Sequence, residues 1–115
     1  MLRCLIVDDS QDFLASARRL LDSQGVEVVG VATNSAEAIR LLAELEPDIA
    51  LIDVELGDED GIALARQVKR TAPETRTILI SAHGLDDLDL TEAGADVFFL
   101  QKTALGADAI AGLIG

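Results

Sequence analysis

Two stretches decide the fold of this chain: Leu5-Ile6-Val7-Asp8-Asp9 and Ile49-Ala50-Leu51-Ile52-Asp53. Each begins with a short, uninterrupted apolar run and ends in acidic residues. Apolar runs of this length are typical of strands that are covered by helices on both faces of a sheet. Further runs at 26–32, 77–80 and 97–100 bring the number of expected strands to five.

Between these runs the sequence shows helical spacing, with apolar residues recurring at intervals of three and four. The clearest apolar stripe consists of Phe13, Leu14, Ala17, Leu20 and Leu21. Two further helices are expected to bury Ile39, Leu42 and Ala43, and Ile62, Ala65 and Val68, respectively. A weak acidic helix is expected at 86–93 and a last short helix at 104–114. The candidate N-caps are Asp9 or Ser10 for the first helix and Asn34 or Ser35 for the second.

This alternation of strands and helices predicts an α/β fold built on a parallel sheet with right-handed crossovers. Because the segment between Ser81 and Gly94 is short, the helix within it should be stunted. The stretch 55–61, rich in acids and glycines, is expected to be a loop in which Asp58, Glu59 and Asp60 are solvated charges.

The composition limits the classes of function. The chain has 115 residues, half of them hydrophobic, which suits one domain with a real core. Its net charge of −12 argues against direct binding to nucleic acid or to anionic membranes. No apolar run is long enough to span a bilayer, and the N-terminus does not read as a signal peptide. The one cysteine, Cys4, excludes an internal disulfide and is expected to be a small buried hydrophobe, which fits a cytoplasmic protein.

Polar residues follow four of the expected strands: Asp8-Asp9, Asp53, Ser81 and Lys102. Ligands of such sheets bind at the carboxyl ends of the strands, so these side chains are expected to meet at one edge. Two ionised carboxylates ~5 Å apart repel each other by about 3 kcal/mol at an effective dielectric of 20. Such a cluster needs raised pKa values or a bound cation, and hard oxygen ligands suit Mg²⁺. Helix capping alone would explain one of these acids but not the whole set.

With these motifs the chain resembles the receiver domain of two-component response regulators along nearly its whole length. The matching segments are 5–9, 49–53 with Gly61 beyond it, 78–82, and 94–96 leading to Lys102. The resemblance implies a doubly wound five-stranded parallel sheet of order 2-1-3-4-5, the flavodoxin and CheY-like class, here with a shortened helix 4. It also implies that residues 1–115 form one receiver domain.

The resemblance implies a phosphoacceptor site. Asp53 would accept a phosphoryl group as an aspartyl phosphate. Asp9 and Asp53 would bind Mg²⁺ directly, Asp8 mostly through water, and the backbone carbonyl of Glu55 would complete the protein ligands. This cation would screen the acids and bind phosphoryl oxygens during transfer.

The resemblance also assigns roles to the last two strand ends. Lys102 would pair with one phosphate oxygen, and Ser81 would donate a hydrogen bond to another. An aromatic side chain behind Ser81 would then rotate inward as a switch. Counting back from Lys102 favours Phe99 for this role, whereas counting forward from Gly94 favours Phe98. Both could instead be packing residues, one on each face of the sheet.

The expected function is therefore that of a cytoplasmic phosphoacceptor, with no enzymatic activity beyond self-phosphorylation and slow self-hydrolysis. The implied partners are a sensor histidine kinase or a phosphotransfer protein, a second copy of the chain on phosphorylation, and a C-terminal output domain. A degenerate receiver that acts only by protein contact is the alternative. Phosphatases of the haloacid dehalogenase type are disfavoured because Asp8 and Asp9 are adjacent, and no nucleotide-binding glycine motif is present. His83 lacks the partners of a catalytic base.

Overall fold

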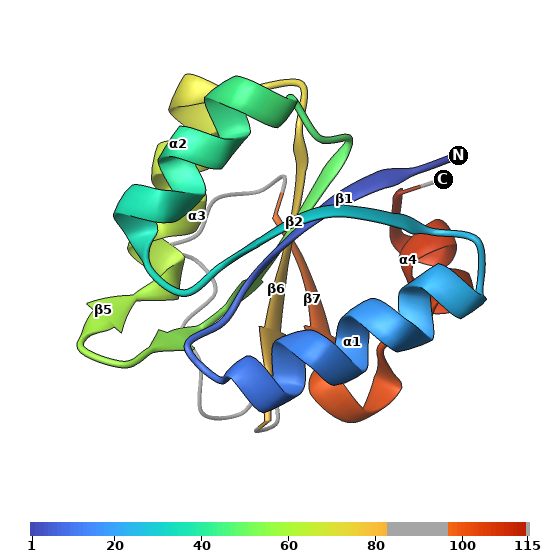
Figure 1. The fold of residues 1–115 in the computed structure, drawn as a ribbon. Coiled ribbons are helices and arrows are strands. Elements are labelled where there is room, and N and C mark those ends of the chain that lie inside the picture. Colours follow the sequence, from blue (N-terminus) through green and yellow to red (C-terminus); the bar gives the residue numbers. More distant parts are fainter. Residues whose placement is uncertain (83–96, 115) are drawn as a thin grey trace.

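The computed structural model describes residues 1–82 and 97–114, which form a twisted sheet with helices on both faces (Figure 1). The elements in chain order are β1 (Arg3–Val7), α1 (Gln11–Ser23), β2 (Glu27–Ala32), α2 (Ser35–Leu45), β3 (Ile49–Asp53), β4 (Glu55–Leu56), β5 (Glu59–Asp60), α3 (Gly61–Thr71), β6 (Arg76–Ser81), β7 (Phe98–Gln101), the 3₁₀ turn η3 (Lys102–Ala104) and α4 (Ala107–Ile114). The weak helix expected at 86–93, its shortening, His83 and the segment 94–96 lie outside the described residues.

The main sheet has five strands in the order β2-β1-β3-β6-β7, and all neighbouring strands pair in parallel. Since β6 and β7 are the fourth and fifth strands of this sheet, the predicted order 2-1-3-4-5 is confirmed. The prediction of a simple loop at 55–61 is wrong, because β4 and β5 pair antiparallel as a small hairpin. Backbone hydrogen bonding is therefore satisfied locally in this acidic segment.

Two apolar layers hold the helices to the sheet. One layer lies beneath α2 and α3 and includes Leu42, Ile52 and Val68, all 4% exposed or less. The other lies beneath α1 and α4 and includes Leu14, Ile6 and Ile110, all 5% exposed or less. Residues 4–7 of β1, together with β3, are buried throughout, as expected for strands covered on both faces.

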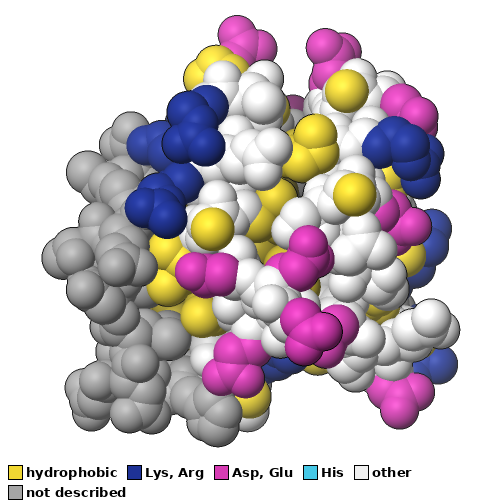
Figure 2. All heavy atoms as spheres, turned by 90° about the vertical axis from the view of Figure 1, so that its left-hand side faces the viewer, with side chains coloured by type: hydrophobic (Ala, Val, Ile, Leu, Met, Phe, Trp, Pro, Cys, Tyr) yellow, Lys and Arg dark blue, Asp and Glu magenta, His cyan; other side chains and the backbone are white. Residues whose placement is uncertain are grey.

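Figure 2 shows the face formed by α2 and α3, where hydrophobic side chains lie between the two helices and acidic side chains gather toward the β4–β5 hairpin. Cys4 is fully buried, as predicted. Within the described ranges, no helix combines the length and the apolar character needed to cross a bilayer.

Three helix predictions are wrong in detail. Leu20 is 38% exposed, because the buried stripe of α1 runs through Leu14, Ala17 and Leu21 and leaves Leu20 at its margin. Ala43 is exposed, and Ala38 takes its place in the core with Leu42, one turn away. The last helix begins at Ala107 rather than at residue 104, because η3 and an extended Leu105 precede it.

The structure resolves the open capping alternatives. Ser10 caps α1 by accepting a hydrogen bond from the backbone N–H of Phe13. Asn34 caps α2 by accepting one from Glu37. Both side chains satisfy backbone donors that a helix start otherwise leaves unpaired.

Candidate functional site

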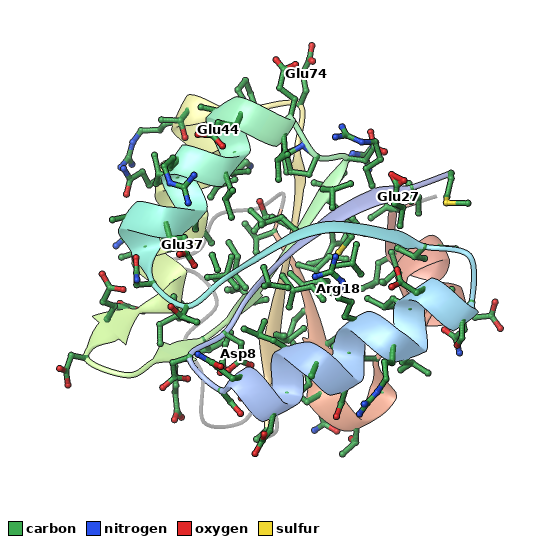
Figure 3. The ribbon with its side chains drawn as sticks, viewed as in Figure 1. Asp8, Arg18, Glu27, Glu37, Glu44 and Glu74 are labelled. Carbon is green, nitrogen blue, oxygen red and sulfur yellow. The ribbon has the colours of Figure 1, made fainter. Side chains whose placement is uncertain are left out.

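The carboxyl ends of the strands bring the predicted polar side chains together. Asp8 and Asp9 follow β1, and Asp53 is the last residue of β3. One carboxylate oxygen from each of these three residues lies within 4.8 Å of the others. Figure 3 shows Asp8 where β1 ends and the chain turns into α1. The convergence that parallel pairing of β1 and β3 predicts is therefore present.

The three acids differ in burial. Asp8 is fully buried and Asp53 is 6% exposed, whereas Asp9 is exposed. Asp8 Oδ1 accepts a hydrogen bond from Ser10 N at 2.9 Å, and Asp53 Oδ1 accepts one from Glu55 N at 3.0 Å. These backbone donors fix one oxygen of each buried carboxylate.

Lys102 connects the two buried acids. Its Nζ lies 2.7 Å from Asp8 Oδ2 and donates a hydrogen bond to Asp53 Oδ2 at 3.1 Å. Burial works to lower the pKa of Lys102, but its interactions with the two carboxylates outweigh this effect and raise that pKa above its ordinary value. The ammonium therefore stays charged at the centre of the site.

Asp53 experiences opposing effects. Burial raises the pKa of its carboxyl above the ordinary value, and the nearby charge of Asp8 adds to the rise. The hydrogen bond from Glu55 N and the Lys102 ammonium work in the opposite direction. Ionisation of Asp53 is thus costly in the free protein, which favours binding of a cation beside it.

A hollow of about 210 Å³ opens beside these groups. Its lining residues are Asp9, Asp53, Glu55, Gly57, Ser81, Ala82 and Lys102. The lining combines carboxylates with the ammonium of Lys102, so it can hold a cation with several waters or a small anion beside a cation.

The residues present fit Mg²⁺. All candidate side-chain ligands are hard carboxylate oxygens, which Mg²⁺ prefers. Asp8 Oδ2 is buried and accepts no hydrogen bond from the described residues, although Lys102 Nζ is close to it. Among the described residues its charge is therefore compensated by this ion pair alone, and a cation or its water shell would add to that compensation.

Asp58, Glu59 and Asp60 are all exposed, as predicted for solvated charges, but two of them also make specific contacts that the sequence did not predict. Asp60 caps α3 by accepting a hydrogen bond from Ile62 N at 2.9 Å. Glu59 Oε1 accepts one from Ser35 N, also at 2.9 Å, in the first turn of α2. The positive end of each helix dipole favours a carboxylate there.

Gly61 lets α3 start against the backbone of Asp53. A Cβ atom on Gly61 would overlap the carbonyl oxygen of Asp53 and would lie 2.9 Å from the Cα of Val54. The N–H of Gly61 donates to the carbonyl of Val54 at 2.9 Å. Only glycine permits this approach, which holds the strand end that carries Asp53.

The two candidate switch aromatics lie on opposite faces of the sheet. Phe99 packs against the layer beneath α2 and α3, and Phe98 packs against the layer beneath α1 and α4. Both are partly buried.

Sequence reasoning missed Phe13 as a residue of the site. Its ring, on α1, lies beneath Lys102, with Nζ 4.4 Å from the ring centroid. The spacing of Phe13 indicated only a core position, and it does pack against the layer beneath α1. No local signal relates residue 13 to residue 102, because their contact depends on how α1 lies on the sheet.

A second, larger hollow of about 650 Å³ lies at the other end of the strands, where α2 and α3 end and the chain enters β3 and β6. Its lining includes Leu42, Pro47 and Ala72. The three clustered aspartates and Lys102 are absent from this lining, so the chemistry described above belongs to the smaller hollow.

Comparison with known proteins gives consistent matches. The sequence pattern of the response regulator receiver domain matches residues 4–109. Chemotaxis protein CheY of Bacillus subtilis is 33% identical over 101 residues, covering 86% of this chain and 84% of that protein. The solved response regulator domain of Thermotoga maritima CheB superposes with a TM-score of 0.76 at 31% identity, covering 90% of this chain and 80% of that one.

Other relatives are much longer than the matched region. A protein-glutamate methylesterase/protein-glutamine glutaminase of Alkalilimnicola ehrlichii is 34% identical over 108 residues, covering 90% of this chain and 27% of that protein. The chain thus spans about a quarter of the length of the methylesterase relatives that it matches.

Proposed function

The chain belongs to the response regulator receiver domain family of two-component signal transduction, and we propose that Asp53 is its phosphoacceptor and that Mg²⁺ is required. The observation that carries this proposal is the placement of Asp53. It lines a hollow of about 210 Å³, where its carboxylate lies in a cluster with those of Asp8 and Asp9 and also contacts the Lys102 ammonium. A phosphodonor is an anion, and so is the nucleophile, so positive charge is needed on both sides of the transferred group.

Each residue of the site has a distinct task. Asp9 and Asp53 hold the cation, the backbone carbonyl of Glu55 supports it, and the buried Asp8 acts mainly through its water shell. When bound, Mg²⁺ supplies the positive charge that draws phosphoryl oxygens toward the acceptor. Lys102 supplies the second positive charge from the other side.

Ser81 and Phe99 form the proposed switch. Ser81 pairs with Gln101 and Leu79 pairs with Phe99 in the parallel ladder between β6 and β7. Alternate residues of a strand share a face, so Ser81 lies on the same face of the sheet as Phe99. A movement of the Ser81 hydroxyl toward a phosphoryl oxygen would open space on the side of Phe99. This argument favours Phe99 over Phe98.

The phosphodonor in the cell is a sensor histidine kinase or a phosphotransfer protein, and the domain works in the cytoplasm. Residues 1–115 act as one receiver domain. A second copy of the chain or a C-terminal output domain receives the signal.

Phosphorylation with a small donor tests the proposal. The protein is incubated with acetyl phosphate and Mg²⁺, and its intact mass is measured. We expect one added phosphoryl group, which disappears when Mg²⁺ is chelated beforehand and in Asp53→Asn. Asp58→Asn is the matched control, because Asp58 is an exposed acid of the same hairpin, and this variant should be phosphorylated normally. Absence of the added group, or its persistence in Asp53→Asn, would instead support a receiver that acts by protein contact alone.

A further inference from the structure

Four contacts connect Asp8, Ser10, Phe13 and Lys102 in a ring that begins and ends at Asp8. Asp8 Oδ1 accepts from Ser10 N at 2.9 Å, and Ser10 Oγ accepts from Phe13 N at 3.2 Å. The ring of Phe13 faces Lys102 Nζ at 4.4 Å, and Lys102 Nζ returns to Asp8 Oδ2 at 2.7 Å. The backbone of Phe13 is thus linked to Asp8 through Ser10, and the ring of Phe13 is linked to the same carboxylate through Lys102.

Lys102 is held from two directions by groups of different kinds. The carboxylates of Asp8 and Asp53 contact its ammonium as ions, whereas Phe13 offers the negative face of an aromatic ring. The Lys102 side chain is only 19% exposed, so water competes weakly for the ammonium. A ring contact is stronger in such a partly desolvated place than at an open surface.

We propose that Phe13 is a positioning residue that keeps the Lys102 ammonium over the acceptor site while the carboxylates are engaged elsewhere. This inference rests on the proposed function. A divalent cation on the aspartates repels Lys102 and competes for the same oxygens. The ring has no oxygen ligand, so it does not compete with the acids for that hard cation, and it repels an incoming phosphoryl group less than a carboxylate would. It is therefore the one described partner of Lys102 whose attraction survives loading of the site.

Graded fluorination of the Phe13 ring tests this inference, because fluorine withdraws electron density from the ring face while changing its shape little. Proteins with zero to three fluorines on Phe13 are phosphorylated with acetyl phosphate at saturating Mg²⁺. We expect the logarithm of the maximal rate to fall in proportion to the number of fluorines, with a total loss of about fivefold. Phe13→Trp should keep the rate and Phe13→Leu should lose it.

A merely structural role for Phe13 gives a different result. The rate would then be the same across the fluorinated series, and that outcome would overturn the inference while leaving phosphorylation of Asp53 intact. If the unmodified chain accepts no phosphoryl group, the proposed function itself fails, and the role of Phe13 fails with it.

A measurement without Mg²⁺ or phosphodonor tests the contact by itself. The unfolding equilibrium is compared for Phe13→Leu, Lys102→Met and the double variant. We expect the two substitutions to be non-additive by a factor of about three to five in the unfolding constant. Additivity would show that the ring does not hold the ammonium and would overturn the inference.

Discussion

Replacing Gly61 by alanine should destabilise the protein severely, because the new methyl group would overlap the backbone of Asp53. The clash involves the carbonyl oxygen and carbon of Asp53 and the Cα of Val54, none of which is the end of a flexible side chain. Asp53 ends β3, which lies between β1 and β6, and it pairs with Ile80 of β6. The first turn of α3 must therefore retreat by roughly an ångström, since the strand cannot.

The expected loss of unfolding free energy follows from the interactions that this movement of α3 breaks. The hydrogen bond from Gly61 N to Val54 O is lost, and the cap that Asp60 provides to Ile62 N is strained. Each such interaction contributes about 1 kcal/mol, and overpacking of a close contact adds about 1–3 kcal/mol. We expect Gly61→Ala to lose about 3 kcal/mol or more of unfolding free energy, which lowers the melting temperature by about 10 °C or more.

Urea denaturation followed by circular dichroism measures this loss. Gly112→Ala is the matched control, because Gly112 lies within α4 and a Cβ there would meet no atom within 4 Å. That variant should be stabilised by up to about 1 kcal/mol through helix propensity. If Gly61→Ala stays within about 0.5 kcal/mol of the parent protein, the close approach of α3 to Asp53 is not what holds this end of the strand.

Three further predictions concern the site and the helix ends. Asp53→Asn should raise the unfolding free energy in the absence of divalent cations. Because burial raises the pKa of Asp53, its contribution to stability is present below the ordinary pKa and is lost as pH rises through the folded-state pKa. The gain in Asp53→Asn should therefore grow toward neutral pH, and a gain that shrinks would refute this reasoning. The affinity of Mg²⁺, measured by calorimetry, should weaken as pH falls through the raised pKa of Asp53, since the ion needs the ionised carboxyl; an affinity that does not change with pH would contradict binding to Asp53. Gln24→Ala should cost about 1 kcal/mol in urea denaturation, because Gln24 Oε1 accepts from Ala107 N at 2.6 Å in the first turn of α4. Gln67→Ala, on the exposed face of α3, is its control and should be nearly neutral.

Patterns within single segments predicted much of the fold. The apolar runs at 5–7 and 49–52 identified the central strands because strands covered on both faces have no polar positions. Helical spacing identified the helices, but it could not fix which residues at the margins of a stripe are buried. Leu20 and Ala43 show this, since the tilt of each helix on the sheet decides their exposure.

The candidate site could be predicted because it lies at strand ends. Once β1 and β3 are parallel neighbours, the residues that follow them must meet, so the approach of Asp8 and Asp9 to Asp53 follows from the strand pattern alone. The tasks of Glu59 and Asp60 could not be predicted in this way. A run of acids looks the same whether its members are solvated or accept hydrogen bonds from helix starts.

The order of elements, the apolar layers and the set of charged residues at one edge can thus be read from the amino acids, because each depends on local periodicity and on the geometry of parallel strands. How these groups contact one another follows only from the folded arrangement. The ring of Phe13 contacts Lys102, which is distant from it in the sequence. Gly61 approaches Asp53 because the chain reverses direction in the hairpin between them. Such contacts depend on the packing of a helix against a sheet within an ångström, which no spacing of residues encodes.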